Sequence, residues 1–558
     1  MNSDKTAKNA AANFTTNAAD SAINANPLLD AMGTEMSKTL TENGAVTYST
    51  TASDCLDFFA NIGGMRNRSE RDIVNAFELA YIENPDMAMK LLFYTRDIRG
   101  GLGERKIFRT IVKYLARAHK ESLLKNLKYF SEFGRWDDLL VLIQDYSSAR
   151  AKNAPAEDAA AKNADDDTDC AEAAIAILRD QLNKDVESLR SGEGVSLLGK
   201  WLPSVNASSA ETRRQGKLLA KAFGLSEKEY RQTLTALRQK IKIMENFLRE
   251  GTYEFDYSNV TSQAMLKYRQ AFFRNDYDKY VAYLQAVAEG KTTVNTGTLT
   301  PCEIVNKVAK KLYEVGHYRY WFNYTDEAED ENPTAAIDQN ERLALNTMWN
   351  SLEDFTDDRN ALVVIDGSGS MYRDESPMPI SVAMSLGIYF AERNKGAFAD
   401  HFITFSANPK LIKIKGADIV DKVEYCMRYN EIANTNIERV FHLVLDAAVK
   451  NDLPQEELPE TIYIVSDMEF DYCTQDASLT NFENAKNMFE RAGYKLPNLV
   501  FWNVSSRNNQ VPVRQHETGT ALVSGYSARK FSYIVENVTP YEFMLEILSK
   551  ERYEAIVA

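Results

Sequence analysis

The chain has 558 residues, of which 44% are apolar and 26% are charged. These values are typical of globular proteins and exclude the collagen-like, wholly disordered and membrane-embedded classes. The formal net charge of −15 at pH 7 excludes a uniformly basic, nucleic-acid-binding coat, so any nucleic-acid site has to be a local patch.

The first 52 residues are rich in Ala, Asn, Thr and Ser, and we expect them to form a flexible N-terminal segment. They contain neither the basic region nor the apolar region of a secretory signal, which favours a cytoplasmic protein. No apolar run reaches the roughly 18 residues of a membrane-spanning helix, so we expect no membrane partner. The five cysteines are scattered and never form a CxxC pair, which argues against a disulfide framework and against a zinc site.

Residues 53–322 have a helical pattern. Apolar residues recur every three or four positions in successive short segments, which are joined by turns around Pro85, Gly100 and Gly134. The clearest segments are 73–82, 87–94, 107–115, 123–133 and 139–143. This succession predicts a helical-repeat array similar to HEAT or armadillo stacking, in which the Ala- and Asp-rich stretch at about 151–172 is an acidic insertion.

Two stretches of this part are strongly basic. Residues 90–128 contain eleven Lys or Arg against three Asp or Glu, and residues 213–249 contain ten against three. On a helix that begins near Gly103, five cations fall within about 120°. On a helix over 228–249, four cations fall within about 40°. This spacing suits a phosphate backbone, and a solvated helix face is the alternative interpretation. The candidate RNA contacts are Arg96, Arg99, Arg105, Arg109, Lys113, Arg117, Lys120, Arg231, Arg238, Lys242 and Arg249.

The pattern changes after an acidic, linker-like stretch at 323–357. In residues 358–558, short β-branched runs alternate with helical segments. The expected strands are 361–365, 401–405, 411–414, 461–465 and 498–504, and the expected helices are 379–393, 437–450 and 481–492. This alternation predicts a Rossmann-like α/β domain with a parallel sheet, whose ligands lie beyond the carboxyl ends of the strands. The whole chain is therefore expected to be multidomain, with an α part followed by an α/β part.

The first of these strands ends in a candidate metal site. Asp366, Ser368 and Ser370 are alternate residues of a turn that Gly367 and Gly369 permit, so one carboxylate and two hydroxyls can converge. Hard oxygen ligands of this kind suit Mg²⁺. The alternative interpretation is an Asx-type turn that only ends the strand.

Two further residues stand at comparable places in the pattern. Thr435 lies just before the expected helix 437–450, and Asp467 follows the expected strand 461–465. The arrangement resembles a von Willebrand factor A domain with its metal-ion-dependent adhesion site. The resemblance implies that Ser368, Ser370 and Thr435 contact the ion and that Asp366 and Asp467 hold it largely through water. It also implies that an acidic group of a partner fills the vacant coordination position.

The common catalytic motifs are absent. The glycines at 100–103 follow no strand and contain no GxxxxGK[ST] pattern, and Asp366 stands where a GxSxG pattern requires its first glycine. The five histidines show no HExxH or paired spacing. No general base or second metal cluster accompanies the candidate site, so we expect no enzyme activity.

Three local motifs indicate a family. They are the run from Tyr94 to Arg105 (YTRDIRGGLGER), the run from Phe133 to Asp138 (FGRWDD), and KWLP at 200–203. A helical array followed by a von Willebrand factor A domain resembles the TROVE-module proteins of the Ro type. The motifs themselves look closer to a related, largely uncharacterised family that carries a domain of unknown function. The resemblance spans about 53–558 and implies a helical ring that binds small structured RNA outside and single-stranded RNA in its central hole.

The leading hypothesis is therefore a cytoplasmic, non-catalytic RNA-binding scaffold with a divalent-cation site. A metal-dependent protein-adhesion module without RNA is the first alternative. A metal-dependent hydrolase or nuclease is the second.

Overall fold

The computed structural model describes residues 27–144, 162–314, 337–356, 358–373, 375–405, 408–429, 436–472, 478–533 and 538–558. Two compact units can be distinguished by their internal contacts. Unit 1 takes in the described residues of Met1–Ser69, Ala76–Asn84 and Leu284–Ala555, and unit 2 those of Glu70–Asn75, Pro85–Tyr283 and Ile556–Ala558. Within the described ranges, no helix is long and apolar enough to cross a lipid bilayer.

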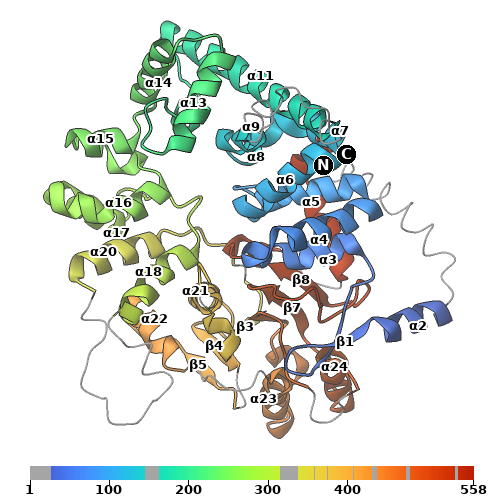
Figure 1. Cartoon of the computed structure of the whole chain (residues 1–558). Helices are drawn as coiled ribbons and strands as arrows, with labels where there is room; N and C mark the ends of the chain where they lie inside the picture. The colour runs from blue at the N-terminus through green and yellow to red at the C-terminus, as the bar shows by residue number, and fades with distance from the viewer. Residues whose placement is uncertain are drawn as a thin grey trace, which may run out of the picture. The chain divides into compact units, whose positions relative to one another are not determined.

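Unit 2 is built of helices, as the apolar spacing of its sequence predicts. They are α5 (Pro85–Arg96), α6 (Arg105–Ala118), α7 (Lys120–Asn126), α8 (Phe130–Phe133), α9 (Leu140–Gln144), α11 (Lys162–Ser191), α12 (Leu198–Trp201), α13 (Ala210–Ala222), α14 (Glu227–Ile241), α15 (Met244–Glu250), α16 (Ser262–Asn275) and the first half of α17 (Tyr277–Ala288). The long helix α11 packs against α6, α7, α9, α12 and α14, and Figure 1 shows it running beside α7 and α9. It starts inside the predicted acidic insertion, of which residues 151–161 lie outside the described residues.

The core of unit 2 around α5 and α6 is aromatic. Phe93 makes edge-on contacts with Phe108, Phe130 and Phe133, with ring centroids 5.2–5.9 Å apart. All four rings are buried. Such edge-to-face pairs add to the stabilisation that burial of the rings provides, so α5, α6 and α8 are fixed against one another.

The predicted single helix over 228–249 is wrong. Its first part is α14, which ends at Lys242 in the left-handed conformation (φ 54°), and α15 begins at Met244. A left-handed residue cannot continue a right-handed helix. The four cations therefore do not share one helical face, and Arg249 belongs to a different helix from Arg231 and Arg238.

Unit 1 contains a six-stranded sheet with the order β5-β4-β3-β6-β7-β8. Its strands are β3 (Ala361–Asp366), β4 (His401–Phe405), β5 (Leu411–Lys413), β6 (Thr461–Ser466), β7 (Asn498–Asn503) and β8 (Thr520–Ser524). All neighbouring strands are parallel except β4 and β5, which are antiparallel. The sheet is therefore mixed, and β8 was not predicted.

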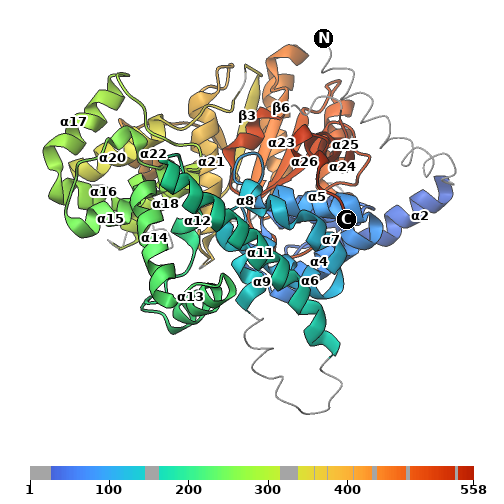
Figure 2. The same ribbon diagram turned by 90° about the horizontal axis from the view of Figure 1, so that it is seen from above.

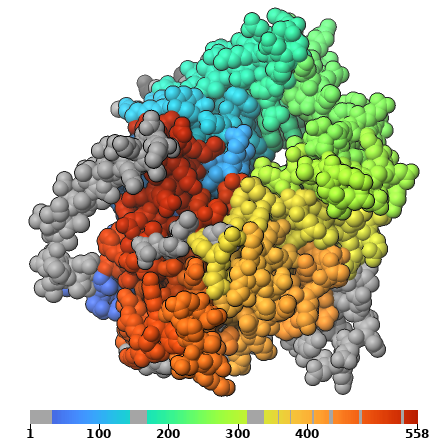
Figure 3. All heavy atoms as spheres, turned by 180° about the vertical axis from the view of Figure 1, so that it is seen from behind, coloured from blue at the N-terminus to red at the C-terminus, as the bar shows by residue number. Residues whose placement is uncertain are grey.

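Unit 1 also contains helices, some of which pack directly on the sheet and others on those helices. They include α18 (Pro301–Glu314), α20 (Gln339–Asn350), α21 (Pro379–Arg393), α22 (Ile419–Met427), α23 (Ile437–Lys450), α24 (Asn481–Arg491), α25 (Pro540–Leu548) and α26 (Glu551–Glu554). Helix α21 packs against β3, β4 and β6, and Figure 2 shows it beside β3. Seen from behind, the surface of unit 1 is formed mainly by the later part of the chain, coloured yellow to red (Figure 3). These elements agree with the predicted α part followed by an α/β part.

The structure divides the chain differently from the predicted linear domains. Helix α20 lies within the predicted linker, where Leu345, Met348 and Trp349 are buried. Helix α3 (Asp54–Ile62), placed by the sequence in the helical array, packs against β8 and α25 in unit 1. At its end a Cβ on Gly63 would lie 2.5 Å from backbone atoms of Ser524 and Gly525, so the two backbones can approach only because this residue is glycine.

The end of the predicted flexible segment is also structured in unit 1. Helix α2 (Pro27–Ser37) is followed by β1 (Lys38–Leu40) and β2 (Val46–Tyr48), which pair antiparallel. The backbone of Tyr48 exchanges hydrogen bonds with Val511. We call residues 38–48 the N-terminal hairpin, and it is anchored to the strand region some 460 residues later in the chain, as its bond to Val511 shows.

A buried acid at the start of α3 predicts a pH effect on stability. Burial raises the pKa of Asp57 from 3.8 to about 6, against the hydrogen bonds that its carboxylate accepts from Thr50 Oγ1 and the Thr51 N–H. Because the folded-state pKa is raised, the protonated acid favours folding below pH 4, and this contribution is lost as the pH rises through 6. The free energy of unfolding of Asp57→Asn, relative to that of the wild type, should therefore rise by roughly 1–2 kcal/mol between pH 4 and pH 7. Urea unfolding at both pH values measures the difference, and a constant difference would contradict the prediction.

Candidate functional site

In unit 2, two of the predicted RNA contacts meet at one buried carboxylate. Asp138 accepts a hydrogen bond from Arg96 Nε at Oδ2 and from Arg109 Nε at Oδ1, both at 2.7 Å. The Arg96 and Asp138 side chains are 1% and 0% exposed, and Asp137 lies 2.7 Å from Arg109 Nη2. Arg96 therefore cannot present its charge to RNA, which corrects the prediction for this residue. The charge of Arg109, which stays half-buried, is balanced by the same acids.

The glycines of the first two motifs serve this ion network. A Cβ on Gly134 would lie 2.4 Å from Asp138 Oδ2 and 2.7 Å from Arg96 Nε. A Cβ on Gly101 would lie 2.0 Å from the carbonyl oxygen of Tyr94. Both positions require a residue without a Cβ, because real side chains never approach that closely. The YTRDIRGGLGER and FGRWDD motifs thus allow α5, α6 and the turn before α9 to pack closely around this ion network.

The other predicted contacts of this region are nearer the surface. Arg99 is exposed and donates to the Glu132 carbonyl at 2.9 Å, and Lys120 forms an ion pair with Asp169 at 2.7 Å. Arg105 and Arg117 are exposed on α6, and Lys113 is half-buried on the same helix. Four of the five predicted cations, Arg105, Arg109, Lys113 and Arg117, lie on α6. Lys120 does not belong to this face, because α6 ends at Ala118 and Lys120 begins α7.

On α14, Arg238 is turned inward and the other cations are exposed. Its three guanidinium nitrogens donate to the carbonyls of Gly199 and Leu202 and to Ser204 Oγ at 2.7–2.8 Å. These partners are neutral, so the positive charge of Arg238 has no acidic partner in the described parts of the chain, and burial lowers its pKa. Arg231, Lys242 and Arg249 are exposed on α14, at its end and on α15.

A cavity of about 580 Å³ brings the two basic helices of unit 2 together. It is lined by Lys106, Arg109 and Lys113 of α6, Thr212 and Gln215 of α13, Arg238 of α14, and by Glu70, Thr110, Asp137, Leu140, Val141, Trp201, Leu202, Pro203, Ser204 and Ala207. Four cations against two acids leave a positive excess, and the volume is that of an ordinary ligand site. We call it the basic cavity.

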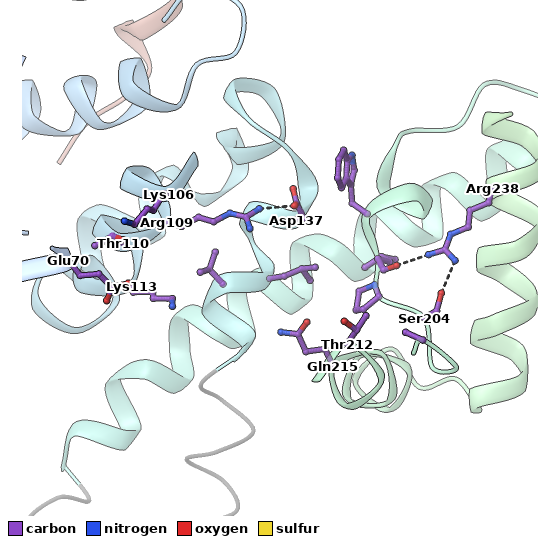
Figure 4. A pocket seen from close by; sticks show the side chains of 16 residues that line it. Glu70, Lys106, Arg109, Thr110, Lys113, Asp137, Ser204, Thr212, Gln215 and Arg238 are labelled. Carbon is purple, nitrogen blue, oxygen red and sulfur yellow. Dashed lines mark hydrogen bonds and ion pairs between the residues drawn. The ribbon is translucent and has the colours of Figure 1, made fainter. Parts of the chain in front are cut away.

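Two features of the basic cavity were not predicted. Gln215 points into it from α13, on the side opposite Lys113, and its buried Nε2 has no hydrogen-bond partner in the described ranges (Figure 4). Trp201 of the KWLP motif also lines the cavity, with the Arg135 guanidinium 4.4 Å from its ring centroid. The sequence indicates the KWLP motif, but it contains no signal that places Trp201 in a cavity.

In unit 1, the predicted metal ligands lie at the carboxyl ends of β3 and β6. The fully buried Asp366 accepts hydrogen bonds at Oδ1 from the Ser368 N–H, 2.8 Å away, and at Oδ2 from Ser466 Oγ, 2.5 Å away. Burial, and then the charge of nearby Asp467, raise the pKa of Asp366. Among the described residues Asp366 has no cationic partner, and a buried carboxylate without one is costly. Thr435 lies outside the described residues.

The spacing of the two serines fits a magnesium ion. Their Oγ atoms share a hydrogen bond and are 3.0 Å apart. Two neighbouring ligands of an octahedral ion, each about 2.1 Å from it, are separated by roughly the same distance. No group of three or more His, Cys, Asp or Glu in the described ranges could hold a metal, so this site depends on hydroxyls as well as carboxylates. Asp366, Ser368, Ser370 and Asp467 are thus compatible with Mg²⁺.

The sequence did not reveal the cation that already stands beside Asp467. Arg507, which follows β7, places Nη2 3.0 Å from Asp467 Oδ2, and its side chain is 9% exposed. Its Nη1 contacts Glu42 of the N-terminal hairpin. Contacts that span 40 and 465 residues leave no periodic signal in a sequence.

Comparisons with known proteins identify the family. The model of a domain of unknown function, DUF2828, matches residues 41–175 and 210–358, which together are just over half of the chain. The chain belongs to the DUF2828 family. A second domain of unknown function, DUF7788, matches residues 360–544 and begins one residue before β3. The relation to a family that carries a domain of unknown function is therefore confirmed.

Relatives of this DUF2828 protein add no established activity. The uncharacterized protein L728 of Acanthamoeba polyphaga mimivirus is 29% identical over 542 residues, which cover 91% of this chain and 86% of the relative. The crystal structure of the Deinococcus radiodurans RO (RSR) protein matches 91% of this chain and 100% of that chain at 12% identity. Its TM-score of 0.32 is too low to establish a shared fold.

Proposed function

We propose that this DUF2828 protein is a non-catalytic RNA-binding scaffold. Unit 2 would hold single-stranded RNA by its phosphates at the basic cavity, in the manner of a TROVE-type module. Unit 1 would be a von Willebrand factor A-like domain with Mg²⁺ at Asp366, Ser368, Ser370 and Asp467. The observation that carries the RNA proposal is that cations of α6 and α14, predicted separately, line one cavity.

The charges of the basic cavity support a polyanion as its ligand. Lys113 has no ion-pair partner in the described parts of the chain, and Arg238 bonds only neutral oxygens. Trp201 adds an aromatic ring to the cavity, and a base that stacks on it would use the ring face that Arg135 leaves open. Gln215 Nε2 adds a donor that has no partner among the described residues. Cations, an aromatic ring and an amide donor together suit a nucleotide strand.

Replacing Lys113 tests the RNA proposal. Lys113→Glu reverses one charge in the cavity and should weaken binding of a single-stranded RNA oligonucleotide about tenfold or more, with a shallower salt dependence, since each lost contact removes roughly 0.7 from the log–log slope. Mobility shifts between about 50 and 200 mM salt measure both effects.

Lys221→Glu is the matched control, because Lys221 is exposed on α13 and does not line the cavity. An equal loss in both variants, or wild-type binding that is insensitive to salt, would contradict the proposal. Cleavage of the labelled RNA in Mg²⁺ would contradict its non-catalytic part.

A further inference from the structure

Arg507 joins the candidate magnesium site to the N-terminal hairpin. Its guanidinium contacts Asp467 on one side and Glu42 on the other. Arg373, which follows the serines of the site closely in the chain, lies 3.8 Å from the same Glu42 carboxylate. Asp467 is 3% exposed and Glu42 is half exposed, so this row of charges runs from the interior of the sheet edge to the surface.

The hairpin is fixed to the segment that follows Asp467. The Glu42 N–H donates to Glu469 Oε2 at 2.7 Å, and Asn43 Nδ2 donates to the Glu469 carbonyl at the same distance. Thr41 Oγ1 donates to the Phe470 carbonyl at 2.6 Å. The position of Glu42 is therefore set by the backbone that carries the site, and not by the ion pair with Arg507 alone.

The two buried acids of the site differ in their neutralisation. Asp467 has the Arg507 guanidinium at 3.0 Å, whereas Asp366 has only neutral hydrogen-bond donors within the described ranges. A divalent cation bound between the two acids would be repelled by the positive Arg507 guanidinium beside Asp467. The guanidinium would have to move away from Asp467, and Glu42 is the acid that can keep it paired.

We propose that Arg507 is a built-in competitor of the divalent cation and that Glu42 sets the balance by holding the released guanidinium. This inference rests on the magnesium site of the proposed function. Its consequence is a linkage: if Glu42 favours cation binding, the cation must equally favour the docked state of the hairpin. Cation binding at the site and docking of residues 38–48 would then stabilise each other.

Calorimetric titration of the full-length protein with Mg²⁺ tests the proposal through variants with opposite expected signs. Arg507→Gln removes the competing charge and should tighten binding about tenfold. Arg507→Lys keeps the charge and should bind as the wild type does. Glu42→Gln removes the acid that retains Arg507 and should weaken binding several-fold. In the wild type, Mg²⁺ should slow hydrogen exchange in residues 38–48, and in Glu42→Gln it should not.

The outcomes separate this proposal from the metal site itself. If the wild type binds Mg²⁺ and a folded Arg507→Gln protein binds it with equal or lower affinity, Arg507 is not a competitor of the cation. That result leaves the magnesium site itself intact. If Arg507→Gln does not fold, Glu42→Gln and the exchange measurement still decide, because unchanged affinity and unchanged exchange overturn the linkage. Absence of binding in both the wild type and Arg507→Gln overturns the magnesium site as well.

Discussion

Asp138→Ala is expected to lower the free energy of unfolding of unit 2 by about 3–5 kcal/mol. The substitution leaves the Arg96 guanidinium, 1% exposed, without its carboxylate partner. It also removes a partner of Arg109 and the acceptor of the Arg135 N–H. A buried charge that loses its partner costs more than the pair contributed, because the protein interior cannot solvate it.

The measurement is chemical denaturation followed by circular dichroism, in which the transition of unit 2 should shift. Asp137→Ala is the control, since Asp137 is 16% exposed and Arg109 keeps Asp138. A loss of about 1 kcal/mol or less is expected there. Equal losses in the two variants would show that burial of the Arg96–Asp138 pair is not the cause.

Gly101→Ala is expected to destabilise the same unit by about 1–3 kcal/mol or more. The added methyl group would stand 2.0 Å from the Tyr94 carbonyl oxygen, a backbone atom that cannot rotate away, and 3.0 Å from Asp97 Cβ. The turn between α5 and α6 must therefore open.

Gly194→Ala provides the matched control, because nothing lies within 4 Å of a Cβ at that glycine. Its denaturation midpoint should stay near that of the wild type. A Gly101→Ala protein as stable as Gly194→Ala would mean that the turn relaxes freely, against the structural explanation of the glycine motif.

Local patterns in the sequence predicted much of the fold. The α/β alternation after residue 358 gave β3, β4, β6 and β7 nearly to the residue, because buried parallel strands are continuous apolar runs. Helices α21 and α23 were also predicted with their observed bounds. The strand β8 was missed, since five residues without alternation carry little periodic signal.

Interactions between distant residues account for what the sequence did not reveal. Arg238 looks like a surface cation by its helical position, yet it binds two carbonyls some 36–39 residues earlier. Arg96 likewise lies in a basic stretch of the sequence, yet its side chain is buried in an ion pair with Asp138. The candidate residues Asp366 and Asp467 lie at strand ends, as expected, because buried strands are readable as continuous apolar runs. Arg507 and Glu42 meet only through tertiary structure.

The discontinuity of unit 1 has a consequence for how the protein is made. Unit 2 is nearly continuous in the chain, so all of it except Ile556–Ala558 has been synthesised once residue 283 has emerged. Unit 1 cannot be completed by then, because Tyr48 pairs with Val511 and α3 packs on β8. The apolar face of α3 has no β8 to pack against until more than 450 further residues have been synthesised, as the separation of its bonded partners shows. A chaperone that shields nascent apolar segments would be needed longest at that helix.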